Sequence, residues 1–214
     1  MLDRFKAFWQ GTALAPIINL FIRLGISPDV VTLVGTVGVA AGALVCFPQG
    51  WLWQGDLVVA AFIFSDLIDG AMARKIGRTD TFGAFLDSTL DRIADAALFG
   101  GMALFFAWQA EDPVYLVLSL VCLVMGSVTS YARAKGEQLG FNAKTGLAER
   151  PDRLVGLLVP LFFGDLFGLP ILYEIGLWLI AVLSTVTVIQ RIVLVRKQAL
   201  AAVINESAGT PPQP

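Results

Sequence analysis

Long apolar stretches alternate with short polar ones along most of the chain. This pattern predicts six helices long enough to cross a bilayer. They are expected at residues 28–47, 51–76, 83–108, 113–137, 153–169 and 172–197. The chain therefore reads as an all-α integral membrane protein with six transmembrane helices, in which residues 1–204 form a single domain.

The two ends of the chain differ from the apolar middle. Residues 1–24 interleave large apolar side chains with charged ones, which is typical of an amphipathic helix lying at the membrane interface. They contain no compact apolar core before a cleavage site, so a removable signal peptide is not expected. Ser27, Pro28 and Asp29 predict a helix start, with a capping hydroxyl, a first-turn proline and a first-turn acid. Residues 205–214 have little to bury and are predicted to be disordered.

The composition agrees with a membrane setting. Of the 214 residues, 57% are hydrophobic and 15% charged, whereas soluble domains carry about 25% charged residues. The absence of histidine removes the commonest general base and histidine-bound zinc. Cys46 and Cys122 lie in apolar segments and are interpreted as small apolar side chains rather than a disulfide. No nucleic-acid partner is expected.

Basic residues lie on one side of the predicted topology. The connections near 48–54, 109–113 and 169–173 contain no Lys or Arg, and all fifteen basic residues lie on or near the opposite side. The positive-inside rule then predicts a multi-pass protein of the cell membrane with both termini in the cytoplasm. The same rule puts residues 66–91 near the cytoplasmic end of their helices, within reach of water-soluble substrates.

Four acids are spaced as helical neighbours in this apolar chain. Asp66 and Asp69 are three residues apart, and Asp87 and Asp91 are four apart, so each pair shares a helix face. A carboxylate at membrane depth is costly unless it is paired, hydrated or bound to a cation. An all-oxygen cluster suits Mg²⁺, Mn²⁺ or Ca²⁺. Ion pairs with Arg74 that merely support packing are the alternative, but four acids in register favour a metal site.

These residues also carry a family resemblance. The pattern Asp66-x2-Asp69-Gly70-x2-Ala73-Arg74-x8-Gly83-x3-Asp87-x3-Asp91 resembles the signature of the CDP-alcohol phosphotransferases at all eight fixed positions. Members of that family transfer a phosphoalcohol from a CDP-linked donor to a hydroxyl acceptor and release CMP. The resemblance implies two metal ions, Mg²⁺ with Mn²⁺ as an alternative, held by the four aspartates. It also implies that Asp91 is the general base.

Further residues are expected to bind the donor. Gly70 and Ala73 are small enough for a nucleotide to approach their helix closely. Arg74 can pair with phosphate through its planar fork, and Gly83 permits a tight helix entry. With the contacts that the resemblance adds, the predicted donor-binding set is Asp29, Val30, Val31, Thr32, Asp66, Gly70, Ala73, Arg74, Asp80 and Gly83.

The wider chain resembles one branch of the family, the phosphatidylinositol phosphate synthases of actinobacteria. The likeness rests on SPDVVTLVGT at 27–36, SYARAK at 130–135, GLAERPDRL at 146–154, and Gln190 with Arg191. It implies that CDP-diacylglycerol and inositol 1-phosphate give phosphatidylinositol phosphate and CMP, and that the protein is a homodimer in membrane lipid. The small residues Ala96, Gly100 and Gly101 would permit a close helix contact.

Two arginines point to an anionic acceptor. Arg153 and Arg191 lie at the start and within the body of apolar spans, where an arginine needs an anionic partner such as a phosphate. The resemblance implies an acceptor-phosphate pocket of Ser130, Arg133, Lys135, Pro151, Arg153 and Arg191. The order Arg133 then Lys135 reverses the usual order of that pair.

Other functions stay open at this stage. Glycerol 3-phosphate is a second phosphorylated polyol, so a phosphatidylglycerophosphate synthase fits the same spacing and composition. An ion-coupled transporter could hold intramembrane carboxylates, although the outer connections are short and acidic. A structural membrane scaffold would need no metal-spaced aspartates.

Overall fold

The computed structural model describes residues 15–77 and 81–207, apart from the side chains of residues 66, 67 and 205–207. Within these ranges the chain forms helices and loops and contains no strand. It divides into two compact units, Met1–Asp112 and Pro113–Pro214. The all-α prediction is confirmed for the described residues, whereas most of the predicted interfacial helix of residues 1–24 lies outside them.

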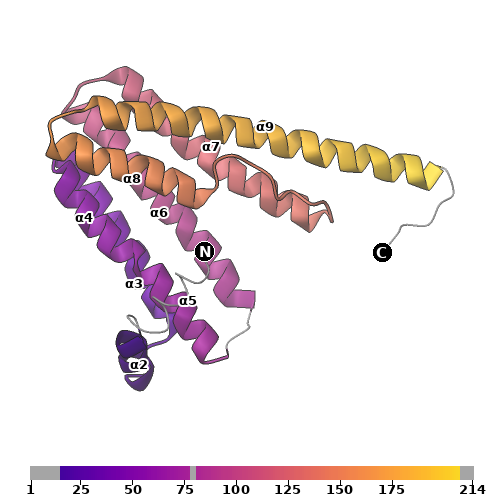
Figure 1. The fold of residues 1–214 in the computed structure, drawn as a ribbon, viewed down its shortest axis with the longest axis horizontal. Helices are drawn as coiled ribbons and strands as arrows, with labels where there is room; N and C mark the ends of the chain where they lie inside the picture. The colour runs from indigo at the N-terminus through magenta and orange to yellow at the C-terminus, as the bar shows by residue number, and fades with distance from the viewer. Residues whose placement is uncertain (1–14, 78–80, 208–214) are drawn as a thin grey trace. The chain divides into compact units, whose positions relative to one another are not determined.

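The first unit begins with α2 (Ala15–Arg23) and α3 (Pro28–Ala41) (Figure 1). The start of α3 is as predicted, because the Val30 amide donates to Ser27 Oγ at 3.4 Å and Pro28 occupies the first turn. Past Ala41 the helix continues as a π-helical turn, η2 (Gly42–Cys46), and a 3₁₀ turn, η3 (Phe47–Gln49). The helical stretch from Pro28 therefore ends two residues beyond its predicted end.

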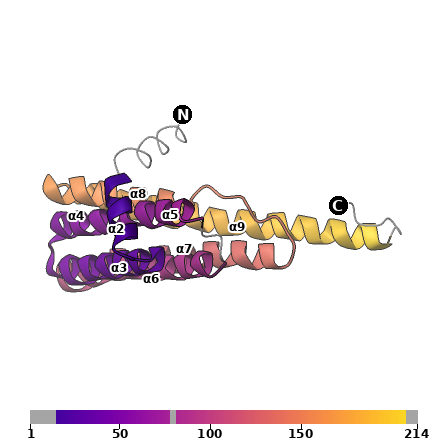
Figure 2. The same ribbon diagram turned by 90° about the horizontal axis from the view of Figure 1, so that it is seen from below.

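The second predicted span is interrupted. It forms α4 (Leu52–Ile63) and α5 (Ser65–Lys75), which follow one another almost in line with a break at Phe64 (Figure 2). At the break the Ser65 hydroxyl donates to the Phe62 carbonyl at 2.6 Å, a local hydrogen bond that competes with the helix ladder. The prediction of one continuous helix over 51–76 was wrong at this position.

α6 (Thr81–Trp108) completes the first unit and packs along α3 and η2. Gly101 allows this approach, because a Cβ at that position would lie 2.6 Å from the Ala43 carbonyl oxygen. The close contact predicted from the small residues near Gly101 is therefore made within one chain. α2 packs on α5, and a buried cluster joins Ile18 of α2, Val31 of α3 and Met72 of α5.

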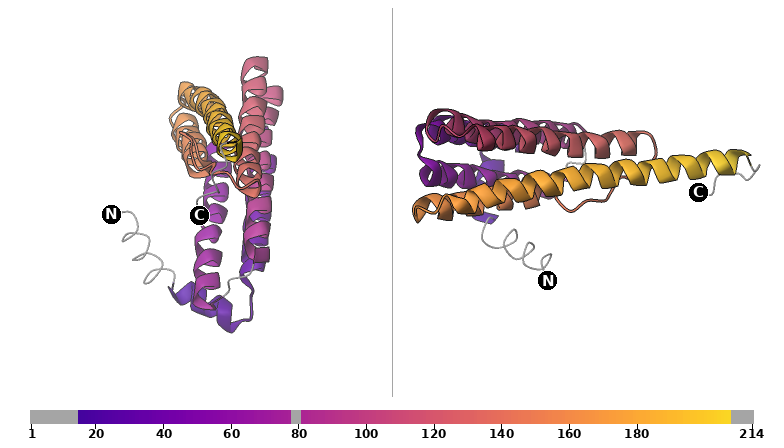
Figure 3. Two further views of the ribbon diagram at one scale, coloured as in Figure 1. Left: turned by 90° about the vertical axis from the view of Figure 1, so that its right-hand side faces the viewer. Right: turned by 90° about the horizontal axis from the view of Figure 1, so that it is seen from above.

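The second unit consists of α7 (Pro113–Gln138), α8 (Arg150–Leu166) and α9 (Ile171–Ser207), and the C-terminal part of α9 extends well beyond the first residues of α8 (Figure 3). α8 starts three residues before its predicted start because Glu149 and Asp152 form a reciprocal capping box. α9 continues through Ser207, so the prediction of disorder was wrong for residues 205–207. The alanine-rich sequence after Gln198 favours this extension.

Within the described residues, three helical stretches are long and apolar enough to cross a membrane: Pro28–Gln49, Pro113–Gln138 and Ile171–Ile204. The protein is a membrane protein. The other predicted spans differ from these in length or charge, since α4 has 12 residues and α8 has 17, and α6 carries acids along its first half. Six spans therefore remain a prediction. Both cysteines are free, as expected.

Candidate active site

A polar pocket of about 190 Å³ lies in the first unit, between the start of α3, the second half of α5 and the first turns of α6. Its lining residues are Pro28, Asp29, Thr32, Asp69, Gly70, Ala73, Gly83, Ala84 and Asp87. Seven of these nine are residues that the sequence predicted for the donor or the metal. The pocket joins positions as far apart in the chain as Asp29 at the start of α3 and Asp87 on α6.

Asp69 is a buried, hydrogen-bonded acid of this pocket. Its side chain is 7% exposed, and Thr32 Oγ1 donates to its Oδ2 at 2.5 Å. Thr32 is itself buried, and its hydroxyl also lies 3.1 Å from the Pro28 carbonyl oxygen one turn earlier. A hydrogen bond to a carboxylate is among the stronger ones in proteins. α3 therefore fixes the orientation of the α5 carboxylate.

The remaining predicted metal ligands are placed less completely. Asp87 is exposed at the pocket, and Asp91 is half-buried one turn later on α6. Arg92 lies 3.8 Å from Asp91 and 3.7 Å from Asp95, as a neighbouring counter-charge. Among the described side chains no three ligating groups are close enough to hold a metal ion. The Asp66 side chain lies outside that description, and the predicted cluster requires it.

The oxygen chemistry of the pocket nevertheless suits a hard divalent cation. Two carboxylates, Asp69 and Asp87, face one cavity, and one of them already has the supporting hydrogen bond that metal-ligating carboxylates typically have. Asp66 precedes Asp69 by three residues on α5, the spacing that places side chains on one helix face. These residues fit Mg²⁺ or Mn²⁺.

The other predicted donor contacts lie at the rim of the pocket or away from it. The Arg74 guanidinium folds back over Gly70, since a Cβ on Gly70 would lie 3.5 Å from Arg74 Nη1. Val30 is exposed and Val31 is buried in the cluster with α2, and neither lines the pocket. Asp80 lies outside the described residues.

The second unit contains two deeply buried arginines, Arg153 at 2% and Arg191 at 3% exposure. Arg191 donates from Nε to the Thr145 carbonyl at 2.8 Å and from Nη1 to the Thr129 carbonyl at 2.5 Å. Arg153 Nη1 lies 3.5 Å from the Ala148 carbonyl oxygen. Both guanidinium groups therefore border the loop that precedes α8.

The other predicted acceptor residues surround this loop unequally. Arg133 pairs with Glu137 on its own helix at 3.1 Å and with Glu149 at 3.6 Å. Lys135 is exposed and its ammonium donates to Gln138 at 3.0 Å. The Ser130 hydroxyl donates to the carbonyl one turn earlier, and Pro151 is exposed in the first turn of α8. The structure brings Arg133 and Arg191 together through Glu149.

The loop itself is tied to α9 by residues that sequence reasoning missed. Thr187 Oγ1 accepts from the amides of Leu147 and Ala148 at 3.0 and 3.1 Å. Further along α9, Gln198 exchanges two hydrogen bonds with the backbone of Asn142. Thr187 sits in an apolar run with no motif around it, so no sequence signal distinguished it. Glu149 lies inside the GLAERPDRL motif but was not assigned a role.

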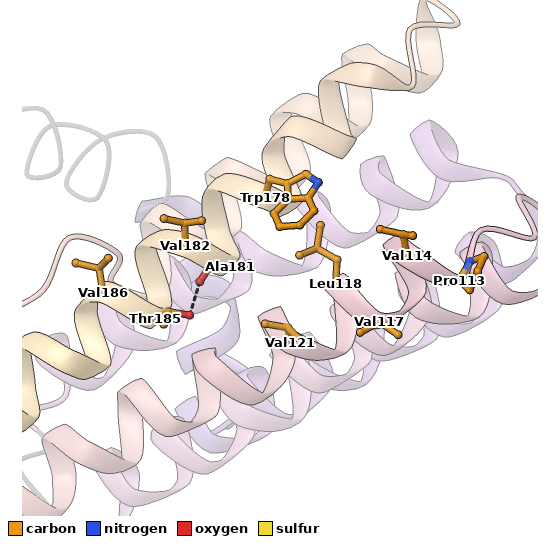
Figure 4. Close-up of a pocket in the computed structure, with 10 residues that line it drawn as sticks. All are labelled: Pro113, Val114, Val117, Leu118, Val121, Trp178, Ala181, Val182, Thr185 and Val186. Atoms are coloured by element: carbon orange, nitrogen blue, oxygen red, sulfur yellow. Dashed lines mark hydrogen bonds between the residues drawn. The ribbon is translucent and has the colours of Figure 1, made fainter.

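A second cavity has a different chemistry. It is an open groove of about 690 Å³ between α7 and α9, with Val117 and Leu118 on one wall and Trp178 and Val182 on the other (Figure 4). The Thr185 hydroxyl on its wall donates to the Ala181 carbonyl of its own helix at 2.7 Å. Among the residues that the structure describes, no ionisable side chain lines this groove, so phosphoryl chemistry belongs elsewhere.

The sequence matches a family model described as CDP-alcohol phosphatidyltransferase over residues 25–186. The matched range contains every residue of the polar pocket. The chain belongs to the CDP-alcohol phosphatidyltransferase family. It is therefore a membrane transferase of phospholipid synthesis, and the transporter and scaffold alternatives are set aside.

Relatives within the family are similar over nearly the whole chain. The phosphatidylinositol phosphate synthase of Streptomyces avermitilis is 49% identical over 221 residues, covering 98% of this chain and 91% of the relative. The crystal structure of the Mycobacterium tuberculosis phosphatidylinositol phosphate synthase with CDP-DAG bound matches with a TM-score of 0.81 at 41% identity. It covers 84% of this chain and 92% of that chain. A second structure of that enzyme, in complex with manganese and citrate, also has a TM-score of 0.81 at 41% identity and covers 84% of this chain and 87% of that chain.

Proposed function

We propose that the protein transfers the phosphatidyl group of CDP-diacylglycerol to inositol 1-phosphate, giving phosphatidylinositol phosphate and CMP. The observation that carries the proposal is the pair of buried arginines in the second unit of a family member. A CDP-alcohol phosphatidyltransferase needs a hydroxyl acceptor, and Arg153 and Arg191 suit an acceptor that also carries a phosphate. The names of the relatives support inositol phosphate over other phosphorylated alcohols.

We assign the donor to the polar pocket of the first unit. Asp66, Asp69, Asp87 and Asp91 would hold two divalent ions, Mg²⁺ or Mn²⁺, and the manganese in a related structure supports that assignment. Bound cations of this kind neutralise the charge of a diphosphate and stabilise the leaving phosphate. Gly70, Ala73 and Gly83 leave room for the nucleotide, and the rim position of Arg74 suits a phosphate contact. Contacts from Asp29, Val30, Val31, Thr32 and Asp80 complete the proposed donor set.

Asp91 is the proposed general base. The acceptor hydroxyl loses its proton as its oxygen attacks the phosphorus that carries the diacylglycerol, and CMP leaves with the other phosphate. A half-buried carboxylate one turn beyond Asp87 can accept that proton. The acceptor's own phosphate is held separately by Arg153, Arg191 and Arg133, with Ser130, Lys135 and Pro151 beside them.

The proposal includes the membrane arrangement that the basic residues indicate. The chain would cross the membrane six times, with both termini and the active site on the cytoplasmic side and residues 1–24 along the interface. The polar pocket would then be open to soluble acceptor while the donor's acyl chains stay in lipid. A homodimer is proposed from family resemblance.

An acceptor panel tests the function. The full chain in lipid vesicles with CDP-diacylglycerol and Mn²⁺ or Mg²⁺ receives inositol 1-phosphate, glycerol 3-phosphate or free inositol, and CMP release and the lipid product are measured. We expect inositol 1-phosphate to be preferred and free inositol to be poor. Preference for glycerol 3-phosphate would replace the proposed product with phosphatidylglycerophosphate. Equal use of free inositol would contradict the proposed acceptor-phosphate pocket.

Variants of the arginines sharpen the test. Arg153→Met keeps most of the buried volume but removes the charge, and Arg191→Ala removes the second fork. Losing a desolvated contact to phosphate costs roughly 2–4 kcal/mol, so the KM for the acceptor should rise tens to hundreds of fold while the KM for the donor changes little. Arg196→Ala, exposed on the same helix as Arg191, is the matched control and should leave both values near wild type.

A further inference from the structure

Glu149 places a carboxylate between two of the arginines assigned to the acceptor phosphate. Its Oε1 lies 3.6 Å from Arg133 Nη1 and 3.9 Å from Arg191 Nη2. The Glu149 side chain is 52% exposed, whereas that of Arg191 is 3% exposed. An accessible internal anion therefore occupies the guanidinium faces that a phosphate would use.

The backbone of Glu149 is fixed, and its carboxylate also accepts from the Asp152 amide in the capping box of α8. The Glu149 amide donates to Asp152 Oδ2 at 2.9 Å, and the preceding amide of Ala148 donates to Thr187 Oγ1. The two arginine contacts, in contrast, are longer than hydrogen bonds. Arg191 keeps its two carbonyl partners without Glu149. A rotation of the carboxylate that keeps the capping hydrogen bond can thus release both arginines without dismantling the loop.

We infer that Glu149 is an internal competitor of the acceptor, which occupies the Arg133–Arg191 subsite until the acceptor's phosphate displaces it. The inference rests on the proposed function. A phosphate monoester carries about −1.5 to −2 charges at neutral pH against one for a carboxylate, so it outcompetes Glu149 for the two arginines. A neutral polyol, which gains little from the arginine charges, does not.

Charge balance around the subsite agrees with this role. The cations that face it are Arg133, Arg191 and the nearby Arg153, and the anions are Glu149 and Glu137. Glu137 pairs with Arg133 at i,i+4 on α7 and stays in place when a phosphate enters. Glu149, in contrast, contacts arginines of both α7 and α9. Displacement of Glu149 therefore frees the guanidinium groups of Arg133 and Arg191 together.

The test compares Glu149→Gln with Glu137→Gln in the full chain in lipid vesicles. Glutamine keeps a side-chain oxygen for capping α8, so the loop is retained. The probes are inorganic phosphate, which is largely dianionic at pH 8, and dimethyl phosphate, which carries one charge. Dissociation constants are measured by titration without donor, so the readout is independent of turnover.

We expect Glu149→Gln to bind inorganic phosphate about 2- to 5-fold more tightly than wild type, the scale of one exposed ion pair. Dimethyl phosphate should gain by no more than the same factor, because the cost of displacing Glu149 is the same for either probe. Glu137→Gln should tighten phosphate binding less. Unchanged or weaker phosphate binding by Glu149→Gln would overturn the inference, because Glu149 would then organise the arginines rather than compete for them.

The two proposals can fail separately. Tighter phosphate binding by Glu149→Gln together with a preference for glycerol 3-phosphate in the acceptor panel would keep the inference and replace the acceptor. A clear preference for inositol 1-phosphate with no tightening in Glu149→Gln would keep the function and remove the role of Glu149.

Discussion

The hydrogen bond between Thr32 and Asp69 offers the sharpest test of the donor pocket. Thr32→Val replaces the hydroxyl with a methyl group of similar size, so the packing of α3 is kept while the 2.5 Å bond to Asp69 is lost. Both side chains are less than a tenth exposed, Thr32 at 8% and Asp69 at 7%. Water can therefore replace the missing donor only poorly.

The size of the effect follows from two independent scales. A buried hydrogen bond to a charged group contributes about 1.5–3 kcal/mol. Loss of a partner that orients a metal-ligating carboxylate weakens metal binding by about 10- to 100-fold, which corresponds to about 1.4–2.7 kcal/mol. The two estimates overlap. We therefore expect the metal concentration for half-maximal activity to rise about 10- to 100-fold, with little change in kcat at saturating metal.

The assay is CMP release by the full chain at saturating CDP-diacylglycerol, titrated with Mn²⁺ and separately with Mg²⁺. Thr32→Ser retains the hydroxyl and should stay near wild type. Thr36→Val is the matched control, because the Thr36 hydroxyl is equally buried but donates to the Thr32 carbonyl of its own helix at 3.0 Å. An unchanged metal titration for Thr32→Val, or an equal shift for Thr36→Val, would refute the reasoning.

Three other substitutions probe the base, the loop and the packing of the first unit. Asp91→Asn should lower turnover roughly 100-fold or more with a much smaller loss of donor affinity, and equal losses in both would reduce Asp91 to a ligand. Thr187→Val leaves two loop amides without their acceptor and should lower stability by about 1–3 kcal/mol while raising the acceptor KM; Thr185→Val, whose hydroxyl bonds only its own helix, is the control. Gly101→Ala drives a methyl group to 2.6 Å from a backbone carbonyl of η2 and should destabilise by about 1–3 kcal/mol in thermal unfolding. Gly100→Ala meets nothing within 4 Å, and a similar loss there would argue against the packing explanation.

Short-range features of this protein were readable from the amino-acid order. The start of α3 follows from Ser27 and Pro28, because capping and proline geometry act over one turn. The aspartate signature predicted the family, and Asp69 and Asp87 do line one pocket. The spacing of acids along a helix is a local property, so the prediction that they share a helix face does not depend on where the helix begins or ends.

The predicted helix boundaries were wrong where contacts with neighbouring elements or competing local preferences determine where a helix ends. At the break at Phe64, the Ser65 hydroxyl donates a hydrogen bond to the Phe62 carbonyl, beside the tightly packed Gly35 of α3. The apolar pattern continues through it without interruption. The extension of α9 beyond residue 197 was not predicted, because alanine is only weakly apolar and does not continue the apolar pattern. Alanine nevertheless favours helix formation strongly.

The acceptor side shows most clearly what only the tertiary structure decides. Arg191 was predicted to need an anionic partner because a charged side chain within an apolar span is energetically costly, which the sequence alone shows. Its partners are different: the carbonyls of Thr129 and Thr145 and the carboxylate of Glu149 lie 62, 46 and 42 residues before it. Contacts of that separation depend on how α7, α8 and α9 pack, and a one-residue shift of any helix would exchange them. The sequence by itself therefore determined which charges the protein must accommodate, and the packing of helices decided which of them face one another.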